Sequence, residues 1–437
     1  MPTRHDRQAF AAGMLLGISL TGLGVVLAQA VFGPVLARSL SSTEEQILSD
    51  VHDRLVDDYV VPLNEQELMR TGVRAMIEAL GDEYSSFVGP DEVSTYHEQS
   101  SGRLIGIGAI IAEGGRVRYP QPGGPAERAG LRPGDQILAV DGESAEGMDV
   151  DVLVARIKGE PRTTVHLQLR RHRDGEIFAV EIPREAVPTG TVGRAEMLDP
   201  AQRLGRIHIR SFARSTPQEL DAALDQLLEQ GMQGLVLDLR FNRGGLLDAA
   251  VACAARFVEG GVICTLEGRG NTHQVRRADP DDYRDLDLPI VVLLNEHAAS
   301  GSEVLAAALR DRGAAVIAGD RSYGKGVYQQ VQKYEDGDFV IKFTAGYYVT
   351  PAGRIIEGHF DPRMPGGIEP DLPVPPQSFE RQRLIMAALQ QDPIPEAYRD
   401  EAVAIWEFLE NYPAHPTDPA TNHALAALRT VVPPPTG

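Results

Sequence analysis

The chain has 437 residues, a formal net charge of −20 at pH 7 and two cysteines. This length has room for two or three domains, and the acidic balance argues against nucleic acid as a partner, since phosphate binding needs a basic face. Two cysteines are too few for a disulfide framework, and no His/Cys cluster has metal-ligand spacing. Cys253 and Cys264 are expected to be buried thiols, with one bridge between them as the alternative.

A long apolar segment lies near the N-terminus. From Gln8 to Ala37 no residue is charged, and Arg4 and Arg7 precede this run. About 20 apolar residues are enough for a helix to cross a bilayer, and a basic flank stays in the cytoplasm, so the remaining chain is expected outside. Ala28-Gln29-Ala30 is also typical of a signal-peptidase site. A retained anchor and cleavage after Ala30 therefore both remain open.

The next two regions of the chain have different sequence patterns, the first helical and the second rich in short β runs. Residues 38–99 are expected to be helical, with one helix starting at Ser42 and another at Asn64 that ends at Gly81. Residues 100–186 alternate short β runs with glycines, as in "RLIGIGAII", "RVRY", "QILAVDG" and "TTVHLQLRR". The segments "PAERAG" and "VDVLVARI" are expected to be short helices, so this region predicts a small self-contained β domain.

Residues 187–375 predict an α/β layered domain. The runs "GRIHIR", "GLVLDLR", "PIVVLLN" and "AAVIAG" are almost continuously apolar, which is expected of strands in a sheet that is covered on both faces. The intervening helices are "TPQELDAALDQLLEQG", capped by Thr216, "LLDAAVACAARFV" and "SEVLAAALRDRG". Residues 376–437 are expected to be helical again, as in "EAVAIWEFLENY", before the tail "TVVPPPTG".

Ser300 has two interpretations. With Glu303 it forms the S-x-x-E spacing of a capping box in front of a helix. It also directly follows a buried strand, and open α/β sheets place their sites at that edge. A hydroxyl at a helix N-terminus suits a nucleophile beside an oxyanion site. The local sequence does not decide between a cap and a nucleophile.

Three further features lie in the same domain. Gly244 and Gly245 end "DLRFNRGG" after another buried strand, and adjacent glycines there suit a close backbone approach with N–H groups aimed at an anion. Lys325 stands between two glycines in "SYGKGVYQQ"; it is either a solvated loop residue or a general base, for which it must be desolvated. His297 precedes Ser300 by three residues, so a histidine-based triad is the alternative to a lysine base.

With these motifs in order, the chain resembles the carboxyl-terminal processing (tail-specific) peptidases, serine proteases with a serine–lysine dyad and a PDZ domain. The resemblance covers about residues 45 to 375. It rests on the ordered set "GDEYSSFVGPDE", "IGIGAII", "GGPAERAGLRPGDQILAVDG", "DLRFNRGG", "AASGSEVLAAAL", "GDRSYGKGVYQ" and "YYVTPAGRIIEG…GGIEPDLPV".

The resemblance implies a multidomain α+β protein: a crotonase/Clp-like α/β protease core with a PDZ domain, helical N- and C-terminal regions and an N-terminal membrane anchor. The expected parts are a cytoplasmic stub with the anchor or signal peptide, the N-terminal helical region, the PDZ domain, the serine protease core, and a C-terminal helical region with a tail. In that order they span residues 1–37, 38–99, 100–186, 187–375 and 376–437.

The resemblance also implies roles for single residues. Ser300 matches the family nucleophile in a small-residue run where Ala298 and Gly301 replace a serine and an alanine. Lys325 matches the family lysine, and Gln329 the glutamine four positions later that supports it. The oxyanion donors are expected to be the N–H of Gly301 and one N–H from Gly244 or Gly245. Gly106, Ile107 and Gly108 match the PDZ loop that holds a peptide's terminal carboxylate.

The implied activity is peptide-bond hydrolysis near the C-terminus of exported proteins with apolar or unfolded ends, without a metal or organic cofactor. The protein is expected at the periplasmic side of the inner membrane, anchored or released, as a homo-oligomer assembled through its terminal helices. Whether an adaptor protein takes part stays open. A catalytically inactive PDZ scaffold is the alternative function; a crotonase-like acyl-CoA enzyme would need a cytosolic thioester pool.

Overall fold

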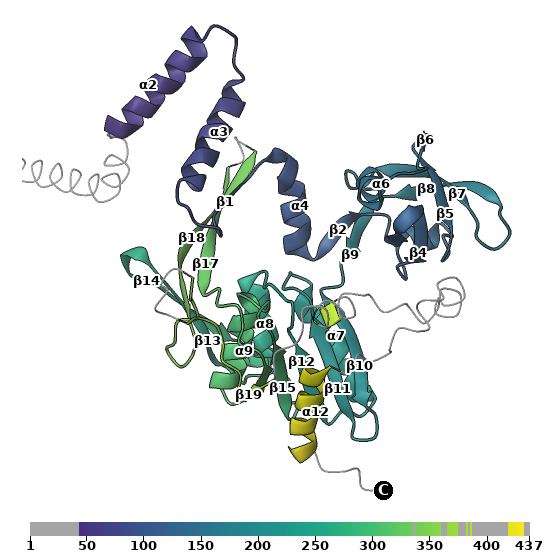
Figure 1. Cartoon of the computed structure of the whole chain (residues 1–437), viewed down its shortest axis with the longest axis vertical. Coiled ribbons are helices and arrows are strands. Elements are labelled where there is room, and N and C mark those ends of the chain that lie inside the picture. The colour runs from purple at the N-terminus through teal and green to yellow at the C-terminus, as the bar shows by residue number, and fades with distance from the viewer. Residues whose placement is uncertain are drawn as a thin grey trace, which may run out of the picture. The chain divides into compact units, whose positions relative to one another are not determined.

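The structure is a computed structural model that describes residues 43–334, 338–359, 365–374, 382, 385–386 and 418–431 (Figure 1). The expected anchor or signal segment lies outside these residues, as does "EAVAIWEFLENY". No helix among the described residues is both long and apolar enough to span a membrane. The chain divides into two compact units, Met1–Met76 and Ile77–Gly437.

The first unit contains helix α2 (Thr43–Asp58) and most of helix α3 (Glu65–Glu78). The predicted start of α3 at Asn64 is confirmed, because the Asn64 side-chain oxygen accepts the Glu67 N–H at 3.1 Å. Gly81 follows the helix with φ +62°, as expected of a residue that ends it. Neither helix buries a side chain in the described structure.

The small β domain forms as predicted, with one extra break. "RLIGIGAII" is two strands, because Gly108 (φ +67°) turns the backbone between them. The sheet order is β3-β4-β5-β7-β8, with β6 paired to β5, while β2 pairs separately with β9. The elements are β2 (Arg103–Gly106), β3 (Ala109–Ala112), β4 (Arg116–Pro120), α5 (Pro125–Arg128), β5 (Gln136–Val140), β6 (Glu143–Ser144), α6 (Val150–Ile157), β7 (Thr164–Arg170), β8 (Ile177–Pro183) and β9 (Glu185–Pro188).

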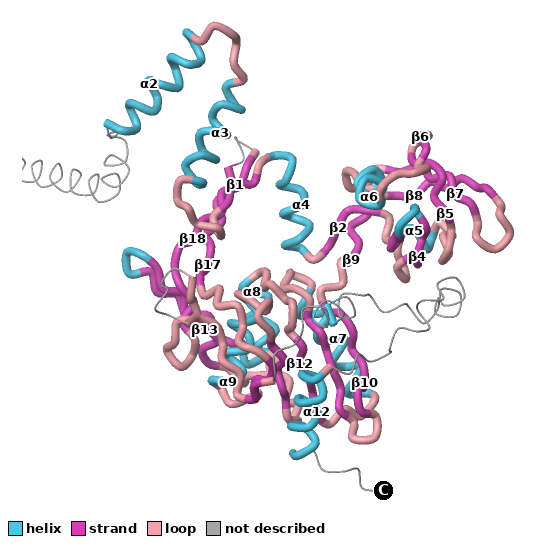
Figure 2. The backbone as a smooth tube through the Cα atoms, viewed as in Figure 1, coloured by secondary structure: helices cyan, strands magenta, loops and turns pink. Residues whose placement is uncertain are grey.

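A six-stranded sheet forms the centre of the α/β layer (magenta in Figure 2). Its first pair is antiparallel and all its other pairs are parallel. Every residue of the strands at 204–209, 234–238 and 290–294 is buried, which confirms the prediction from their apolar runs. In order, the strands are β10 (Val192–Asp199), β11 (Leu204–Ile209), β12 (Gly234–Asp238), β15 (Ile290–Leu294), β16 (Val316–Gly319) and β19 (Leu372–Pro373).

Helices cover both faces of this sheet because alternate strand residues point to opposite sides. Leu235 and Leu237 join the core with helices α7 (Thr216–Glu229), α8 (Leu247–Ala255) and α9 (Gly301–Asp311). Val236 belongs to a second cluster with Leu425 and other side chains of helix α12 (Pro419–Val431). The C-terminal helix therefore supplies the opposite face of the core.

The structure differs from the sequence predictions in two places: it contains a second, five-stranded sheet that was not predicted, and Thr216 is not the cap of its helix. Strand β1 (Ser86–Val88) lies in the region expected to be helical, just before helix α4 (Pro90–Ser101), and it pairs with residues more than 250 positions away. The other strands are β13 (Gly261–Gly268), β14 (Thr272–Ala278), β17 (Val327–Tyr334) and β18 (Phe339–Val349). Thr216 is the first helical residue and not the cap; its hydroxyl accepts the Ala213 N–H at 2.8 Å.

A buried charge network joins α12 to the loop after β12. The Arg240 guanidinium contacts Asp238 at 2.6 Å and Asp418 at 2.7 Å, and all three side chains are at most 4% exposed. Burial alone would raise the pKa of Asp238, but the Arg240 charge lowers it to about 2. Asp418 also caps α12 by accepting the N–H and the hydroxyl of Thr421 at 3.0 and 2.6 Å.

Removing Asp418 leaves part of the buried Arg240 charge uncompensated. We expect Asp418→Ala to lower the free energy of opening of β12 and α12 by about 3 kcal/mol or more, as for other broken buried pairs. Hydrogen exchange of the amides of both elements measures this.

The matched control is Arg429→Gln, which removes the ion pair of the half-exposed Arg429 on α12 with Asp199 at the end of β10. It is expected to cost under about 1 kcal/mol. If the two substitutions lower the free energy of opening equally, the buried network stabilises β12 and α12 no more than a partly exposed ion pair does.

Candidate active site

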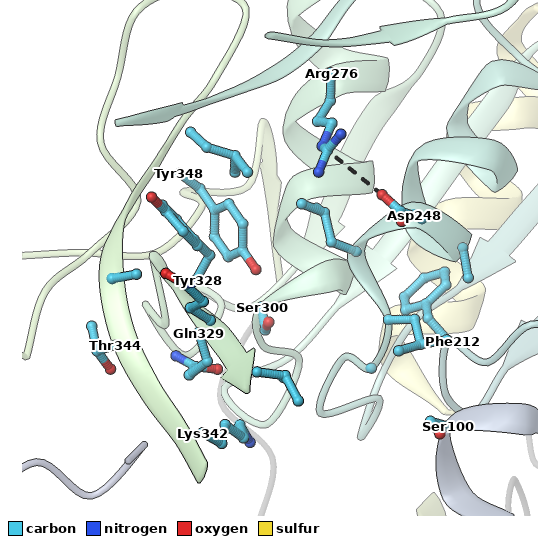
Figure 3. Close-up of a pocket in the computed structure, with 18 of the residues that line it drawn as sticks. Ser100, Phe212, Asp248, Arg276, Ser300, Tyr328, Gln329, Lys342, Thr344 and Tyr348 are labelled. Carbon is cyan, nitrogen blue, oxygen red and sulfur yellow. Dashed lines mark ion pairs between the residues drawn. The ribbon is translucent and has the colours of Figure 1, made fainter. Parts of the chain in front are cut away.

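A cavity of about 1360 Å³ brings the three predicted catalytic side chains together. Ser300, Lys325 and Gln329 all line it. They come from the start of α9, from the loop after β16 and from β17. Figure 3 shows Ser300 and Gln329 at this cavity, with Tyr348 between strand and helix. Residues 25 positions apart in the chain thus face the same space.

Ser300 has an unusual backbone conformation. Its φ of +57° and ψ of −114° are rare for a residue with a side chain. Such strain persists only where neighbouring groups fix it, and it occurs most often at functional sites. Ser300 is also the N-cap position of α9 and is 7% exposed. The cap interpretation is therefore correct for its place in the helix, and the same geometry suits a nucleophile.

The Glu303 carboxylate holds this strained turn against the lysine loop. Its Oε2 accepts the N–H of Ser300 at 2.7 Å and that of Lys325 at 2.9 Å. Its Oε1 accepts the Ser322 hydroxyl at 2.6 Å and the Gly324 N–H at 2.7 Å. Burial raises the pKa of Glu303 to about 7, although the four donors favour its charged form. One fully buried side chain thus joins the two halves of the expected dyad.

Asn242 fixes the Ser300 turn from the other side. Its carbonyl oxygen accepts the Ala299 N–H at 3.0 Å and the Ser302 hydroxyl at 2.9 Å. Its side-chain oxygen accepts the Gly244 N–H at 2.8 Å. Ser302 therefore anchors the turn to Asn242 and does not replace Ser300 as the helix cap.

The three N–H groups expected to bind an oxyanion differ in whether they already donate a hydrogen bond within the protein. Gly244 already donates its N–H to Asn242, whereas the N–H groups of Gly245 and Gly301 have no hydrogen-bond partner among the described residues. A Cβ on Gly244 (φ +98°) would lie 2.8 Å from the Ser300 Cβ, so the two backbones pack closely. A Cβ on Gly301 would lie 3.1 Å from the Phe212 ring, so an alanine there would require a small shift of that ring. The available donors are those of Gly245 and Gly301.

Lys325 is enclosed but does not contact Ser300. Its Nζ lies 4.4 Å from the centre of the Tyr84 ring, and no hydrogen bond joins it to Ser300 in the described structure. Burial lowers the pKa of Lys325, and the nearby Lys342 lowers it further. Asp82, Glu83 and Glu357 oppose this shift. The environment thus favours the neutral amine that a general base requires.

The other polar side chains considered for the site, Tyr348, Gln329 and His297, make fewer contacts than Glu303 and Asn242. The Ser300 side chain interacts with the hydroxyl of the buried Tyr348. The Gln329 amide makes one long hydrogen bond, to the Val327 carbonyl oxygen at 3.4 Å. His297 is half-exposed; it stacks on Phe241 and lies 3.8 Å from Glu296. His297 does not line the cavity among the described residues, so the geometry offers no support for a histidine base.

The remaining predicted groups lie outside this cavity. Both cysteines are buried and free, as expected. In the β domain, the Ile107 and Gly108 carbonyl oxygens accept the N–H groups of Ala126 and Gln121 at 2.7 and 2.8 Å, and Gly106 pairs with β9. No group of three or more metal-ligating side chains occurs within the described ranges.

The sequence predicts the side chains that line the cavity but not the groups that hold them in place. From the sequence Glu303 is only a cap, whereas in the structure its carboxylate reaches 22 residues forward to Lys325. The sequence suggests no role for Asn242, Tyr348 or Lys342. The place of Asn242 two residues before Gly244 is the one signal that could have identified it. Tyr348 and Lys342 belong to a strand that was not predicted.

Comparisons with known proteins identify the family of the chain. Residues 203–374 match Peptidase family S41, and residues 116–171 match a PDZ domain. The "Carboxy-terminal processing protease CtpA" of Bacillus subtilis (strain 168) is 35% identical over 347 residues, which are 78% of this chain and 71% of that protein. A "Probable CtpA-like serine protease" of Staphylococcus aureus (strain N315) is 31% identical over 85% of this chain and 74% of its own length.

A solved structure, the photosystem II D1 C-terminal processing protease, is 28% identical. It aligns with 80% of this chain and 98% of its own, with a TM-score of 0.42.

The role of Glu303 is testable by Glu303→Gln. The amide keeps the shape of the carboxyl group, but it loses the charge and turns an NH₂ group toward backbone donors. We expect kcat/KM for an unfolded protein substrate to fall by about 10²-fold, mainly in kcat, because the dyad is misplaced while the cleft remains.

The control is Glu369→Gln, which removes an exposed ion pair with Arg321 in the same region of the core. It is expected to leave both kcat and KM within about twofold. Wild-type kcat in Glu303→Gln would show that the four hydrogen bonds do not position the dyad.

Proposed function

Because this chain belongs to Peptidase family S41 and is a serine-type peptidase, we propose that it cleaves protein substrates near their C-terminus with Ser300 as nucleophile and Lys325 as general base. One observation carries the proposal: the strained Ser300 and the desolvated Lys325 line one cavity and are joined through the same buried carboxylate. The proposal that cleavage occurs near the C-terminus of the substrate comes from the names of the two bacterial relatives.

In the proposed reaction, neutral Lys325 takes the hydroxyl proton of Ser300 as the oxygen attacks the scissile carbonyl carbon. The negative charge that develops on the carbonyl oxygen is held by the N–H groups of Gly245 and Gly301. Each such donor is worth about 3 kcal/mol in related sites. The Lys325 ammonium then protonates the leaving amine, and water hydrolyses the acyl–serine bond to release the second product.

This sequence requires one movement. The Lys325 Nζ must leave the Tyr84 ring and approach the Ser300 hydroxyl. Tyr84 and Lys325 are both half-buried, and a desolvated cation over an aromatic ring is stabilised by about 2 kcal/mol. The neutral amine lacks this attraction, so the side chain is free to move once it has lost its proton. Gln329, which lines the same cavity, is placed to accept a hydrogen bond from the relocated amine.

We also propose that the β domain binds the substrate tail as a PDZ module. Strand β3 directly follows Gly106-Ile107-Gly108 and is an edge strand in the described sheet, since β4 is its only sheet neighbour. An edge strand beside a turn of this kind offers backbone groups for an added peptide strand. Ile110 and Ile111 on β3 are half-buried and give this edge an apolar character that suits apolar tails.

The dyad prediction compares three substitutions. Ser300→Ala and Lys325→Ala are each expected to reduce cleavage of an unfolded protein by at least about 10³-fold, with unchanged circular dichroism. His297→Ala is expected to keep wild-type activity, since that ring lies on Phe241. Because burial lowers the pKa of Lys325, kcat/KM should rise with pH and level off below the ordinary lysine value of about 10.4.

Product mass spectrometry with the full-length chain measures all three variants. Activity that survives in Lys325→Ala but disappears in His297→Ala would replace the lysine base with a histidine. Absence of any Ser300-dependent cleavage would favour the non-catalytic PDZ scaffold.

We further propose that the protein acts in the cell envelope, on the periplasmic side of the inner membrane, as a homo-oligomer. The uncharged run Gln8–Ala37 with its basic flank supports export. Ile47, Val51 and Met69 are about half-exposed on α2 and α3, which suits helices that pack against another copy.

Cell fractionation and light scattering of the full-length chain test this proposal. We expect the protein in the membrane fraction, or in the periplasm after cleavage at Ala30, and a mass of at least two chains. Ile47→Asp with Val51→Asp is expected to shift the mass toward one chain. A cytoplasmic monomer would contradict the proposal.

A further inference from the structure

The cavity at Ser300 carries a charge opposite to that of the chain. The whole sequence has 62 acidic and 42 basic residues. Of the side chains that line the cavity in the described part of the chain, six are cationic and one, Asp248, is acidic. The six are Arg214, Arg243, Arg269, Arg276, Lys325 and Lys342. A basic cleft in an acidic protein focuses its field on the substrate that enters.

Most of the arginines are not neutralised by the protein itself. No carboxylate of the described residues lies within ion-pair distance of Arg214, Arg243 or Arg269, and all three side chains are exposed. Arg276 is the exception, but its contact is weak. Its Nε lies 3.9 Å from the Asp248 carboxylate and is buried without a hydrogen-bond acceptor (Figure 3).

The cations come from separate elements around the reacting serine. Arg243 directly precedes the glycine pair, Arg269 lies in the turn between β13 and β14, and Arg276 lies on β14. Apolar side chains line the same space, among them Leu246, Leu266 and Tyr348. The cleft is therefore apolar in part and carries guanidinium groups on several sides. Guanidinium groups stay charged at every pH at which a neutral Lys325 is active.

We propose that this cleft selects peptide segments that carry carboxylates within a few residues of the scissile bond. The inference rests on the proposed protease function and names a substrate class for it. Arginines bind carboxylates with two parallel hydrogen bonds, and partial enclosure weakens screening by salt. The carboxylate comes either from an Asp or Glu side chain or from the substrate's own C-terminus; the chemistry of recognition is the same.

Matched unstructured peptides test the preference. Peptides that are identical except for Asp, Asn or Lys at each of the four positions on both sides of a mapped cleavage site are compared as kcat/KM with the full-length chain. In about 50 mM salt we expect Asp to exceed Lys by about tenfold at one or more positions, and the ratio to fall toward about twofold in about 0.5 M salt.

Substitution of the cleft arginines tests whether the preference for Asp peptides comes from the cleft. Arg243→Gln and Arg269→Gln are each expected to lower the Asp/Lys ratio by about threefold or more at the affected position. Arg277→Gln is the matched control. Arg277 is exposed, adjoins Arg276 on β14 and is not among the lining residues, so the ratio should stay at its wild-type value.

A second arm separates the two sources of the carboxylate. For the Asn peptide with the cleavage site four residues from its end, the free acid and the C-terminal amide are compared. Faster cleavage of the free acid assigns recognition to the terminal carboxylate, and faster cleavage of Asp peptides assigns it to side chains. A preference for the free acid supports selection by the cleft only if Arg243→Gln or Arg269→Gln lowers it, because the proposed PDZ module would also favour a free terminal carboxylate; a preference that both variants keep counts against the cleft.

Equal rates for Asp, Asn and Lys together with equal rates for acid and amide would overturn the inference, as would an equal loss in Arg277→Gln. These results leave the protease proposal intact, because cleavage itself would still depend on Ser300. If no peptide is cleaved, calorimetric titration of the same peptides into Ser300→Ala decides. Tighter binding of Asp peptides that Arg243→Gln in the same background reduces supports the inference, and equal binding of Asp, Asn and Lys peptides overturns it.

Discussion

The buried Glu303 carboxylate is the constraint on which the site depends. It accepts four hydrogen bonds, two on each oxygen, from the serine turn and from the loop that carries Lys325. A fully buried carboxyl group is costly unless such donors surround it, so each donor has to stay in place for the others to be useful. The strained backbone of Ser300 is stable only within this arrangement. The position of the Ser300 hydroxyl and the position of the Lys325 loop are therefore fixed by the same side chain.

The wider fold supports this arrangement from outside. Strand β12 ends at Asp238, and the loop that follows contains Arg240, Asn242 and the glycine pair in succession. Arg240 is tied to the C-terminal helix through Asp418, and Asn242 is tied to the serine turn. The loop after β12 thus connects the helix that covers the sheet with the glycine pair and the serine turn over a few residues. A chain end more than 170 residues away takes part in shaping the loop.

The sequence predicted those parts of the fold whose signal is local. The continuous apolar runs at 234–238 and 290–294 became buried parallel strands, and Asn64 began a helix where its side chain could cap. Ser300 and Lys325 were identified from short motifs, and both line the cavity. The sheet of β1, β13, β14, β17 and β18 was missed because β1 and β13 pair with the distant β18 and most residues of β17 and β18 are only half-buried or exposed, so that no apolar run or strict alternation marks them. The reach of Glu303 was missed for the same physical reason: a hydrogen bond across a fold leaves no periodic trace.

Gly244 packs closely against Ser300, and this affects how related chains are judged to be active or inactive from their sequences. A Cβ at this position would lie within 3.0 Å of the Ser300 Cβ, the Ala299 carbonyl oxygen and the Gly301 nitrogen at once. One added methyl group would thus force the Ser300 turn to shift while Ser300, Lys325 and Gln329 stay unchanged in the sequence. A relative with that single change would keep every residue of the expected dyad and lose its geometry. A comparison of the dyad residues alone would not detect the difference, whereas a comparison of the glycine would.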